Sequence, residues 1–411
     1  MKTFPCCAYD ILLDLPKKGY TVRRMNLKIE RIFIMTNDMY TSWQPFLQKA
    51  WDDSGFASPS AIQEKTYDFI CAGRDVIAEA PTGSGKTLAY LLPLLQKIEP
   101  NKKQVQVVVL ASSHELIMQI HQQIQQWSKG SGITSASLIG GANIKRQIDR
   151  LKKKPQIVAG TPGRINELIT KKKLKMHEVQ TLVLDEADQL LVPEHKKTIE
   201  SIVNSTLKDR QLLLFSATIK QEMQNLATQF MTEPETVRVR ESETNKPNVD
   251  HVYIVCEARD KIDMLVKITN LPDAKVLAFR RDIGNLHVLA EKLAYKGLDV
   301  GVLHSDTRKE QRAKALKIFR TSEQALLLAT DVAARGLDIA ELNIVVNMDL
   351  PQDTTGYIHR SGRTGRLGDA AGTVVSLIEQ TDRKRLEKLA RELGITFREK
   401  RLYKGKLVDV Q

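Results

Sequence analysis

Residues 79–95, EAPTGSGKTLAYLLPLL, connect the end of an apolar run to an amphipathic segment through a loop of small residues. Glycines in such a loop let backbone N–H groups turn inward around phosphate oxygens, beside the positive end of the following helix. Lys86 is placed to reach the β- and γ-phosphates of a nucleotide, and the Thr87 hydroxyl to coordinate Mg²⁺. The usual pattern begins with Gly where this chain has Ala80, so the prediction depends on the GSGKT core. The alternative is an ordinary glycine turn before a helix.

The whole loop is predicted to bind nucleotide, through Ala80, Thr82, Gly83, Ser84, Gly85, Lys86 and Thr87. A Mg²⁺ ion bound there also needs a carboxylate on a neighbouring strand. Asp185 in TLVLDEADQLL (181–191) is the candidate, because it ends an apolar run at the edge where open α/β sheets place their ligands. Glu186, one residue on, is placed to accept a proton from the attacking water. The alternative is a solvated helix start, where acids are favoured.

Short apolar runs alternate with longer amphipathic ones along most of the chain. The first half contains such runs at 75–80, 105–111, 134–140, 156–160, 181–187 and 210–218. The second half contains them at 252–257, 275–280, 299–304, 325–331, 343–349 and 372–378. Near-continuous apolar strands separated by helices predict parallel sheets covered on both faces. The fold class is therefore α/β, with two sheets in tandem.

The polar stretch around Pro247 interrupts this rhythm and predicts a linker. The expected organisation is a first domain at 35–238, a linker at 239–250, a second domain at 251–395 and a short basic tail at 396–411. Residues 1–34 show no sustained period, so we expect Met35 to be the natural start and the preceding segment to be a weakly held extension. The alternative is a genuine N-terminal arm.

Composition favours a polyanionic partner and excludes several classes of protein. The chain has 411 residues and a formal net charge of +13, which points to nucleic acid. The alternative is a merely basic protein. An aromatic content of 5% favours contact with the nucleic-acid backbone over base stacking. No run is apolar enough for a membrane helix, and the four cysteines form no metal or disulfide pattern, so we expect a cytoplasmic protein. The lysine runs 152–154 and 171–173 are read as solvated surface.

Asp185, Glu186, Ala187 and Asp188 spell DEAD, and the chain from about 43 to 390 resembles the DEAD-box ATP-dependent RNA helicases. About ten separate motifs occur in the order of that family. The resemblance implies two RecA-like domains, ATP and Mg²⁺. The segment GFASPSAIQ (55–63) resembles the Q motif, in which Gln63 would read the adenine edge. The resemblance also assigns Phe56 to the nucleotide site and suggests Trp43 as the aromatic residue that stacks on the base.

The resemblance assigns the remaining motifs to RNA contact and to coupling between the domains. Ser216 and Thr218 in SAT would bond back towards the acids, and Asp188 and His359 would take part in the same coupling. Asp338 in ATDVAARGLD (329–338) would bind the ribose. In HRSGRTGR (359–366), Arg363 and Arg366 would act as arginine fingers on the γ-phosphate. The residues expected to contact RNA are Gly141, Thr161, Arg164 and Thr330.

Three departures from the family pattern stand out. SSHEL (112–116) occurs where PTREL is usual, which removes a Pro and an Arg that face RNA. HSD (304–306) occurs in place of HGD, and Lys309 takes the place of a usual Gln. We expect RNA binding to be weaker or differently shaped around residues 112–114, where the Ser113 hydroxyl could keep part of the contact.

The resemblance implies a monomeric RNA-dependent ATPase that separates short RNA duplexes when ATP and RNA close the two domains. A bacterial setting in ribosome assembly or cold adaptation is expected, with ribosomal precursors as candidate partners and no membrane. Two alternatives stay open. One is an ATP-gated RNA clamp or RNP-remodelling factor with little unwinding, and the other is a DNA helicase of the same superfamily.

Overall fold

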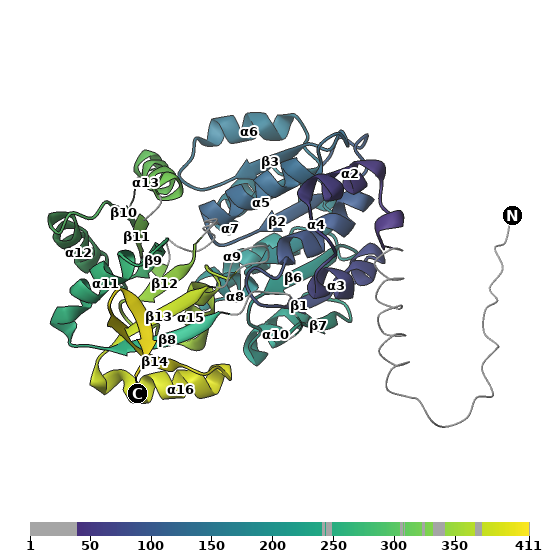
Figure 1. Cartoon of the computed structure of the whole chain (residues 1–411). Helices are drawn as coiled ribbons and strands as arrows, with labels where there is room; N and C mark the ends of the chain where they lie inside the picture. The colour runs from purple at the N-terminus through teal and green to yellow at the C-terminus, as the bar shows by residue number, and fades with distance from the viewer. Residues whose placement is uncertain are drawn as a thin grey trace, which may run out of the picture.

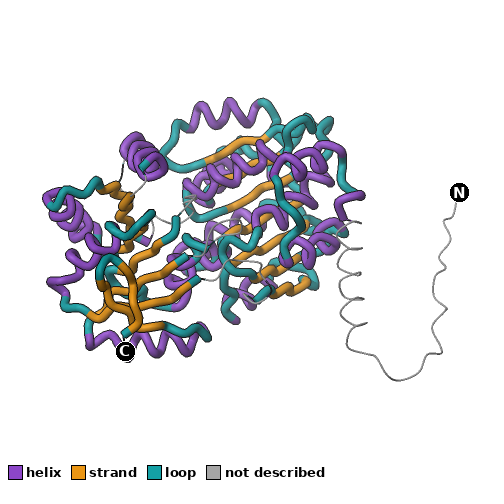
Figure 2. Tube along the Cα trace, viewed as in Figure 1, coloured by secondary structure: helices purple, strands orange, loops and turns teal. Residues whose placement is uncertain are grey.

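The computed structural model describes residues 39–240, 243, 249–304, 307, 309–322, 325–331, 342–365 and 372–410. Within these residues the chain forms two mainly parallel sheets flanked by helices. The two sheets lie side by side in Figure 1, and Figure 2 shows their strands in orange among the purple helices. This arrangement confirms the predicted α/β fold class. Within the described part of the chain, no helix has the length and apolar character needed to span a membrane.

The first sheet has the strand order β3-β4-β2-β5-β6-β1-β7. Its strands are β1 (Val76–Glu79), β2 (Val107–Leu110), β3 (Ser135–Leu138), β4 (Ile157–Gly160), β5 (Thr181–Asp185), β6 (Gln211–Ser216) and β7 (Glu235–Arg238). Its helices are α2 (Pro45–Ser54), α3 (Ala61–Cys71), α4 (Lys86–Lys97), α5 (His114–Trp127), α6 (Ile144–Lys152), α7 (Pro162–Thr170), α8 (Ala187–Leu190), α9 (Pro193–Asn204) and α10 (Gln221–Thr228). All of these strand pairings are parallel, so the carboxyl ends of β1, β5 and β6 meet at one edge.

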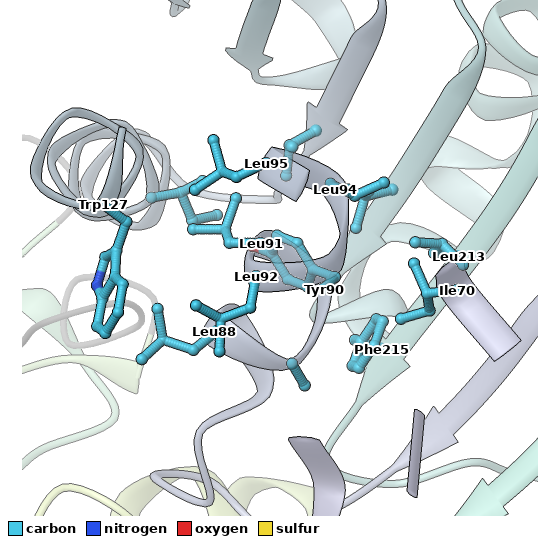
Figure 3. Close-up of a cluster of buried hydrophobic side chains, with 14 of the residues drawn as sticks. Ile70, Leu88, Tyr90, Leu91, Leu92, Leu94, Leu95, Trp127, Leu213 and Phe215 are labelled. Atoms are coloured by element: carbon cyan, nitrogen blue, oxygen red, sulfur yellow. The ribbon is translucent and has the colours of Figure 1, made fainter. Parts of the chain in front are cut away.

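The core of the first sheet follows from the alternation of side chains along buried strands. In β2, Val107 and Val109 pack with α3, α4 and α5, whereas Val108 and Leu110 pack with α7 and α9 on the opposite face. A strand covered on both faces needs apolar residues at every position, which explains the continuous apolar runs. Figure 3 shows the first of these two layers, with side chains from α3, α4, α5 and β6 gathered around Leu91.

The second sheet has the strand order β10-β11-β9-β12-β13-β8-β14-β15. Its strands are β8 (Asp250–Val255), β9 (Lys275–Phe279), β10 (Val300–Leu303), β11 (Ala325–Ala329), β12 (Ile344–Asn347), β13 (Thr373–Ile378), β14 (Arg398–Tyr403) and β15 (Lys406–Asp409). Its helices are α11 (Lys261–Thr269), α12 (Ile283–Tyr295), α13 (Lys309–Thr321), α15 (Thr354–Ser361) and α16 (Arg383–Leu393). Its pairings are parallel except that between β14 and β15, which is antiparallel.

Each of the twelve apolar runs overlaps a strand, but three further strands were not predicted from the sequence. β7 begins at Glu235, just before the polar stretch that was predicted to follow the last strand of the first domain, and it pairs with β1. β14 and β15 lie within 396–411, so the stretch expected to be a tail instead forms a hairpin on the second sheet. β7 and β15 are edge strands of four residues each, and β14 pairs with β8 over two residues before it continues beside β15. All three strands bury few residues, so they carry no continuous apolar run. The predicted extension, 1–34, lies outside the described residues.

The two halves contact each other through side chains on facing helices. Arg312 of α13 forms an ion pair with Glu115 of α5. Gly362, which follows α15, lies so close to Thr82 that an added Cβ would come within 1.5 Å of the threonine Oγ1. The end of α15 therefore packs directly on the phosphate loop of the first half, at a point where any residue larger than glycine would clash.

Candidate active site

The phosphate loop runs from the end of β1 to the start of α4. Gly83 and Gly85 have φ angles of +70° and +91°, which side chains rarely adopt. Ala80 is buried and is not among the positive-φ residues, so a glycine is not required at this position. Lys86 Nζ donates to the carbonyl oxygens of Ala80 (2.7 Å) and Pro81 (2.9 Å). The loop therefore has the predicted strand–loop–helix form despite its departure at Ala80.

Burial lowers the pKa of Lys86, and the charges of Asp185 and Glu186 act in the opposite direction. Those two acids come from the end of β5, next to the loop, as the sequence predicted. A buried ammonium group facing carboxylates and a glycine loop is suited to anionic phosphate oxygens.

Gln63 joins the Q motif to the phosphate loop. Its Oε1 accepts from Ser60 N (2.9 Å), and its Nε2 donates to Gly85 O (3.2 Å). A Cβ added at Gly85 would lie 2.6 Å from this Nε2, so glycine is needed for close approach as well as for its φ angle. The side chain is only 5% exposed, and it also lines the cavity described next.

A cavity of about 340 Å³ extends from the Q motif to the end of α15. Its walls include the predicted residues Phe56, Gln63, Thr82, Gly83, Gly85, Lys86, Thr87, Asp185, Glu186, His359 and Arg363. These residues come from both halves of the chain and lie up to three hundred positions apart in sequence. A site whose walls combine a half-exposed aromatic residue, a lysine and carboxylates fits a nucleoside triphosphate.

Two aromatic residues, the buried Trp51 and the half-exposed Phe56, line this cavity, and the prediction of Trp43 was wrong. Trp43 is 4% exposed and packs in the core against Tyr40, Trp51 and Tyr67. Phe56 is 47% exposed and lies parallel to Trp127, with 6.3 Å between ring centroids. A half-exposed ring in the cavity wall can stack on a base, whereas a buried indole cannot.

Asp185 is the last residue of β5 and is 3% exposed. Its Oδ2 accepts from Tyr90 Oη (2.9 Å), and its Oδ1 from Glu186 N (2.9 Å). Burial, and then the charge of Glu186, raise the pKa of Asp185 to about 6 against the opposing effect of Lys86. A divalent cation would favour the charged form of this carboxylate.

The oxygens present fit Mg²⁺. Thr87 and Asp185 both line the cavity, and Tyr90, one turn after Lys86, donates to Asp185. Among the described residues no three His, Cys, Asp or Glu side chains gather as a metal site. Mg²⁺ is commonly held by one or two protein oxygens together with water and substrate phosphates, which matches this sparse donor set. Tyr90 was missed by the sequence analysis; its position one turn after Lys86 on α4 could have indicated it.

Glu186 is held in an unusual conformation. Its φ and ψ of +50° and +52° lie in the left-handed region, which costs a non-glycine residue about 1–3 kcal/mol. Its Oε2 is buried and has no hydrogen-bond partner among the described residues. Backbone strain and a buried carboxylate oxygen in the cavity wall are typical of a group positioned for chemistry.

Asp188 connects the two halves. His359 Nε2 and Ser216 Oγ lie 2.9 Å and 2.6 Å from its two carboxylate oxygens. Burial acts to raise the pKa of Asp188, but the hydrogen bonds and charge of His359, together with Ser216, outweigh it and hold the pKa at about 2. Ser216 Oγ also lies 2.7 Å from Thr218 O. Asp188, Ser216 and His359 are therefore joined by their side chains, whereas Thr218 joins them only through its backbone, because its Oγ1 has no hydrogen-bond partner among the described residues.

Arg363 reaches the cavity from the second half. It is 6% exposed, and its Nε donates to His359 O (3.1 Å), which holds the side chain beside the phosphate loop. Arg360, one helical turn before Arg363, is 1% exposed. Its Nη2 donates to Asp331 Oδ2 (2.7 Å) and its Nη1 to Asn347 Oδ1 (2.9 Å), so its guanidinium makes these contacts within the second half. The other predicted finger, Arg366, and the predicted ribose ligand, Asp338, lie outside the described residues.

The predicted RNA-binding residues differ in accessibility. Gly141 has a φ of +68° in an open loop, and a Cβ added there would meet no atom within 4 Å. Thr161 and Thr330 are 8% and 5% exposed. Both terminal nitrogens of Arg164 donate to Ala142 O (3.1 and 3.2 Å), so this guanidinium supports the glycine loop from beneath.

The SSHEL segment begins α5. Ser113 Oγ accepts from Leu116 N (3.1 Å), so its hydroxyl caps the helix. His114 is exposed, and its Nε2 lies 3.4 Å from where a Cβ of Gly140 would be. Burial, then the charges of Arg312 and Arg164, lower the pKa of His114. A neutral imidazole therefore occupies the surface beside the glycine loop.

Comparisons with known proteins agree with this geometry. A family described as DEAD/DEAH box helicase matches residues 60–226, and one described as helicase conserved C-terminal domain matches 260–368. The probable ATP-dependent RNA helicase YfmL of Bacillus subtilis (strain 168) is 52% identical over 364 residues, 89% of this chain and 96% of that protein. The DEAD-box ATP-dependent RNA helicase CshC of Bacillus cereus is 47% identical over 373 residues, 91% of this chain and 95% of that protein.

Solved structures show the same arrangement of two sheets. Dbp5 of S. cerevisiae bound to RNA and ADP BeF3 has a TM-score of 0.79 and 30% identity, with 87% of this chain and 93% of that chain covered. Mss116p bound to single-stranded RNA and AMP-PNP has a TM-score of 0.78 and 26% identity, with 88% and 78% covered. The two halves of the present chain are thus tandem RecA-like domains.

Proposed function

This chain belongs to the DEAD-box ATP-dependent RNA helicases, and we propose that the cavity shared by its two domains carries out ATP hydrolysis. The observation that supports this most directly is the convergence of Lys86, Asp185 and Glu186 from the first domain with Arg363 from the second. Apart from the adjacent acids Asp185 and Glu186, these groups lie far apart in sequence. Because Arg363 comes from the second domain, the site is complete only where the two domains meet.

In the proposed mechanism, Lys86 and the amides of the phosphate loop hold the β- and γ-phosphates. Thr87 and Asp185 would hold Mg²⁺, which supplies neutralising charge at the phosphates when bound. Glu186 accepts a proton from the attacking water, and Arg363 offsets the negative charge that develops on the transferred phosphoryl group. Phe56 stacks on the base while Gln63 reads its edge. Arg366 and Asp338 are proposed as second finger and ribose ligand.

The network of Asp188, Ser216, Thr218 and His359 is proposed to report domain closure. It joins the DEAD segment to the SAT segment in one domain and to α15 in the other through the hydrogen bonds given above. RNA is proposed to lie along the glycine loop and Thr161 of the first domain and Thr330 of the second. Contacts there would be made mainly to the sugar–phosphate backbone, which agrees with the net charge of +13.

We further propose a monomeric cytoplasmic protein that acts on ribosomal precursors, with the domain limits 35–238 and 251–395. β7 ends at Arg238 and β8 begins at Asp250, which supports a linker at 239–250. Crosslinking of bound RNA in cells would identify the target.

Two assays separate this function from its alternatives. RNA, and not DNA, is expected to stimulate ATP turnover, and a short RNA duplex is expected to separate in the presence of ATP. RNA-stimulated turnover without strand separation would instead indicate an ATP-gated clamp. Stimulation by DNA alone would indicate a DNA helicase.

Replacing Phe56 with Ala is expected to raise KM for ATP roughly tenfold, because stacking on an aromatic ring is worth about 1–3 kcal/mol per base. Turnover at saturating ATP should change little, since the ring is remote from the phosphates. The matched control is Trp43→Leu, which should lower Tm and leave KM unchanged because Trp43 is a core residue. Steady-state ATPase assays and thermal melts measure both. A raised KM in the Trp43 variant together with an unchanged KM in the Phe56 variant would identify Trp43 as the stacking residue.

Replacing His114 with Arg is expected to tighten RNA binding at pH 7.5, since it adds a permanent charge where the imidazole is neutral. The log–log dependence of affinity on salt should steepen by about 0.7, the value for one added phosphate contact on a single strand. In the unsubstituted chain affinity should rise as the pH falls through the titration of His114, and the Arg variant should lose this dependence. His114→Gln is the uncharged control. An unchanged salt slope in the Arg variant would place RNA away from this side chain.

A further inference from the structure

The hairpin β14–β15 presents a basic surface around an exposed aromatic ring. Tyr403 is 55% exposed, with Arg401 Cζ 6.0 Å and Lys404 Nζ 5.4 Å from its ring centroid. Lys406 is paired directly opposite Tyr403 across the two strands. We call Arg401, Tyr403, Lys404 and Lys406 the hairpin patch.

The fold of the hairpin sends these side chains outward. Leu402 and Leu407, on the other face, pack on the core of the second sheet, and side chains alternate along a strand. Arg401, Tyr403 and Lys406 therefore share the outer face. The turn is tight, with φ of +46° at Lys404 and +71° at Gly405, which matches the two-residue hairpin turn with both φ values positive. The patch is thus held by a rigid turn and an anchored strand pair.

The acids of the hairpin are already engaged elsewhere. Glu399 accepts two hydrogen bonds of 2.9 Å from Arg383 of α16, and Asp409 pairs with Lys400 at 3.1 Å. Among the described residues, no carboxylate forms an ion pair with the three cations of the hairpin patch. The patch therefore keeps its positive charge, and a charged surface with a planar ring fits a polyanion that carries bases.

The sheet order separates this patch from the proposed RNA path. Thr330 follows β11, the second strand from one edge of the sheet, whereas β15 is the opposite edge. At about 4.8 Å between neighbouring strands, the six spacings between β11 and β15 amount to roughly 29 Å. Figure 1 shows β10 and the C-terminal hairpin at different ends of the second domain. A strand that only fills the interdomain path would not reach the patch, whereas a longer strand would.

We propose that the hairpin patch is an accessory site for single-stranded RNA, which holds a segment flanking the one bound between the domains. Bases stack on Tyr403 and on the Arg401 guanidinium, while Lys404 and Lys406 neutralise phosphates. The site tethers the helicase to RNAs that have a single-stranded flank and so favours such substrates over isolated short strands. This inference rests on the proposed function, since it presumes that RNA occupies the path between the domains.

The test compares a single strand of about 10 nucleotides, the size of one site, with one of about 40 nucleotides. Affinities are measured by fluorescence anisotropy on the full chain with a non-hydrolysable ATP analogue, over a range of salt concentrations. The test variant combines Arg401→Gln, Lys404→Asn and Lys406→Gln; Asn is used because it tolerates a positive φ. The matched control replaces the exposed lysines Lys171, Lys172 and Lys173 with Gln and removes the same charge.

The test variant is expected to bind the long strand at least tenfold more weakly, with the salt slope reduced by about 1.4, since Lys404 and Lys406 each remove one phosphate contact worth about 0.7. Its affinity for the short strand, its ATPase activity with that strand and its Tm should match the unsubstituted chain. Tyr403→Ala should weaken long-strand binding roughly fivefold or more, and Tyr403→Phe should not.

Unchanged long-strand affinity in the test variant would overturn the proposal and would leave the hairpin patch as a surface for an acidic protein. An equal loss in the lysine control would also overturn it, because the effect would then come from overall charge. Failure of the short strand to stimulate ATP hydrolysis in the unsubstituted chain would count instead against the proposed function.

Discussion

Replacing Glu186 with Gln lowers the RNA-stimulated rate of ATP hydrolysis by about 10²- to 10⁴-fold, the contribution expected of a positioned general base. The amide keeps the length of the side chain and the strained backbone of Glu186, and it adds no β-branch that would worsen the left-handed conformation. It removes only the basicity of an oxygen that is buried in the cavity wall. ATP and RNA should therefore still bind, and the domains should still close.

Single-turnover hydrolysis measures the rate, and anisotropy with labelled RNA and ATP measures binding. Glu194→Gln, an exposed acid at the start of α9, is the control and should leave both unchanged. Near-normal turnover in the Glu186 variant would exclude this residue as the base. Loss of ATP binding would show that Glu186 holds the nucleotide in the ground state.

Replacing Arg363 with Ala is expected to lower the turnover number for ATP by about 10³- to 10⁵-fold. This is the contribution of arginine fingers in other phosphoryl-transfer sites. The guanidinium enters a cavity whose other charged groups come from the first domain, so it contributes only when the domains are together. ATP affinity of the open protein should change little. Arg363→Lys should recover part of the rate, because a point charge replaces the planar group without its paired donors.

Arg360→Ala provides the structural contrast, because its guanidinium is bound by Asp331 and Asn347 inside the second domain. This variant should lower Tm, whereas Arg363→Ala should leave Tm nearly unchanged. Thermal melts together with ATPase rates separate the two roles. A loss of less than tenfold in the Arg363 variant would show that this arginine does not act on the phosphates.

Local sequence patterns were sufficient for the parallel sheets and for the phosphate loop. Strands buried on both faces require unbroken apolar residues, and phosphate loops require glycines at special φ angles, so both features are written in adjacent residues. The pairing of Lys86 with Asp185 could also be predicted, because the carboxyl ends of parallel strands meet at one edge of a sheet. The strands β7, β14 and β15 could not be predicted, since they bury few residues and carry no such pattern.

The roles of individual side chains depended on the fold. Trp43 and Phe56 are both aromatic residues near the Q motif, and only packing shows that the first is core and the second lines the cavity. The Ser113 hydroxyl, which was expected to keep part of the RNA contact, caps α5, and the Arg164 guanidinium donates to the backbone of the glycine loop. The contact of either residue with RNA stays a prediction. These intramolecular bonds depend on the position of backbone far away in sequence or on the start of a helix, which the residue type alone does not give.

The sequence by itself therefore determines the class of fold, the phosphate loop and the DEAD acids, because each arises from short-range periodicity or a compact motif. The contacts of His359, Gly362 and Arg363 with groups 171 or more residues away depend on how the hydrophobic cores of the two domains pack against each other. Burial, side-chain direction and pKa shifts arise from that packing, since they are set by distances in space and by exclusion of water.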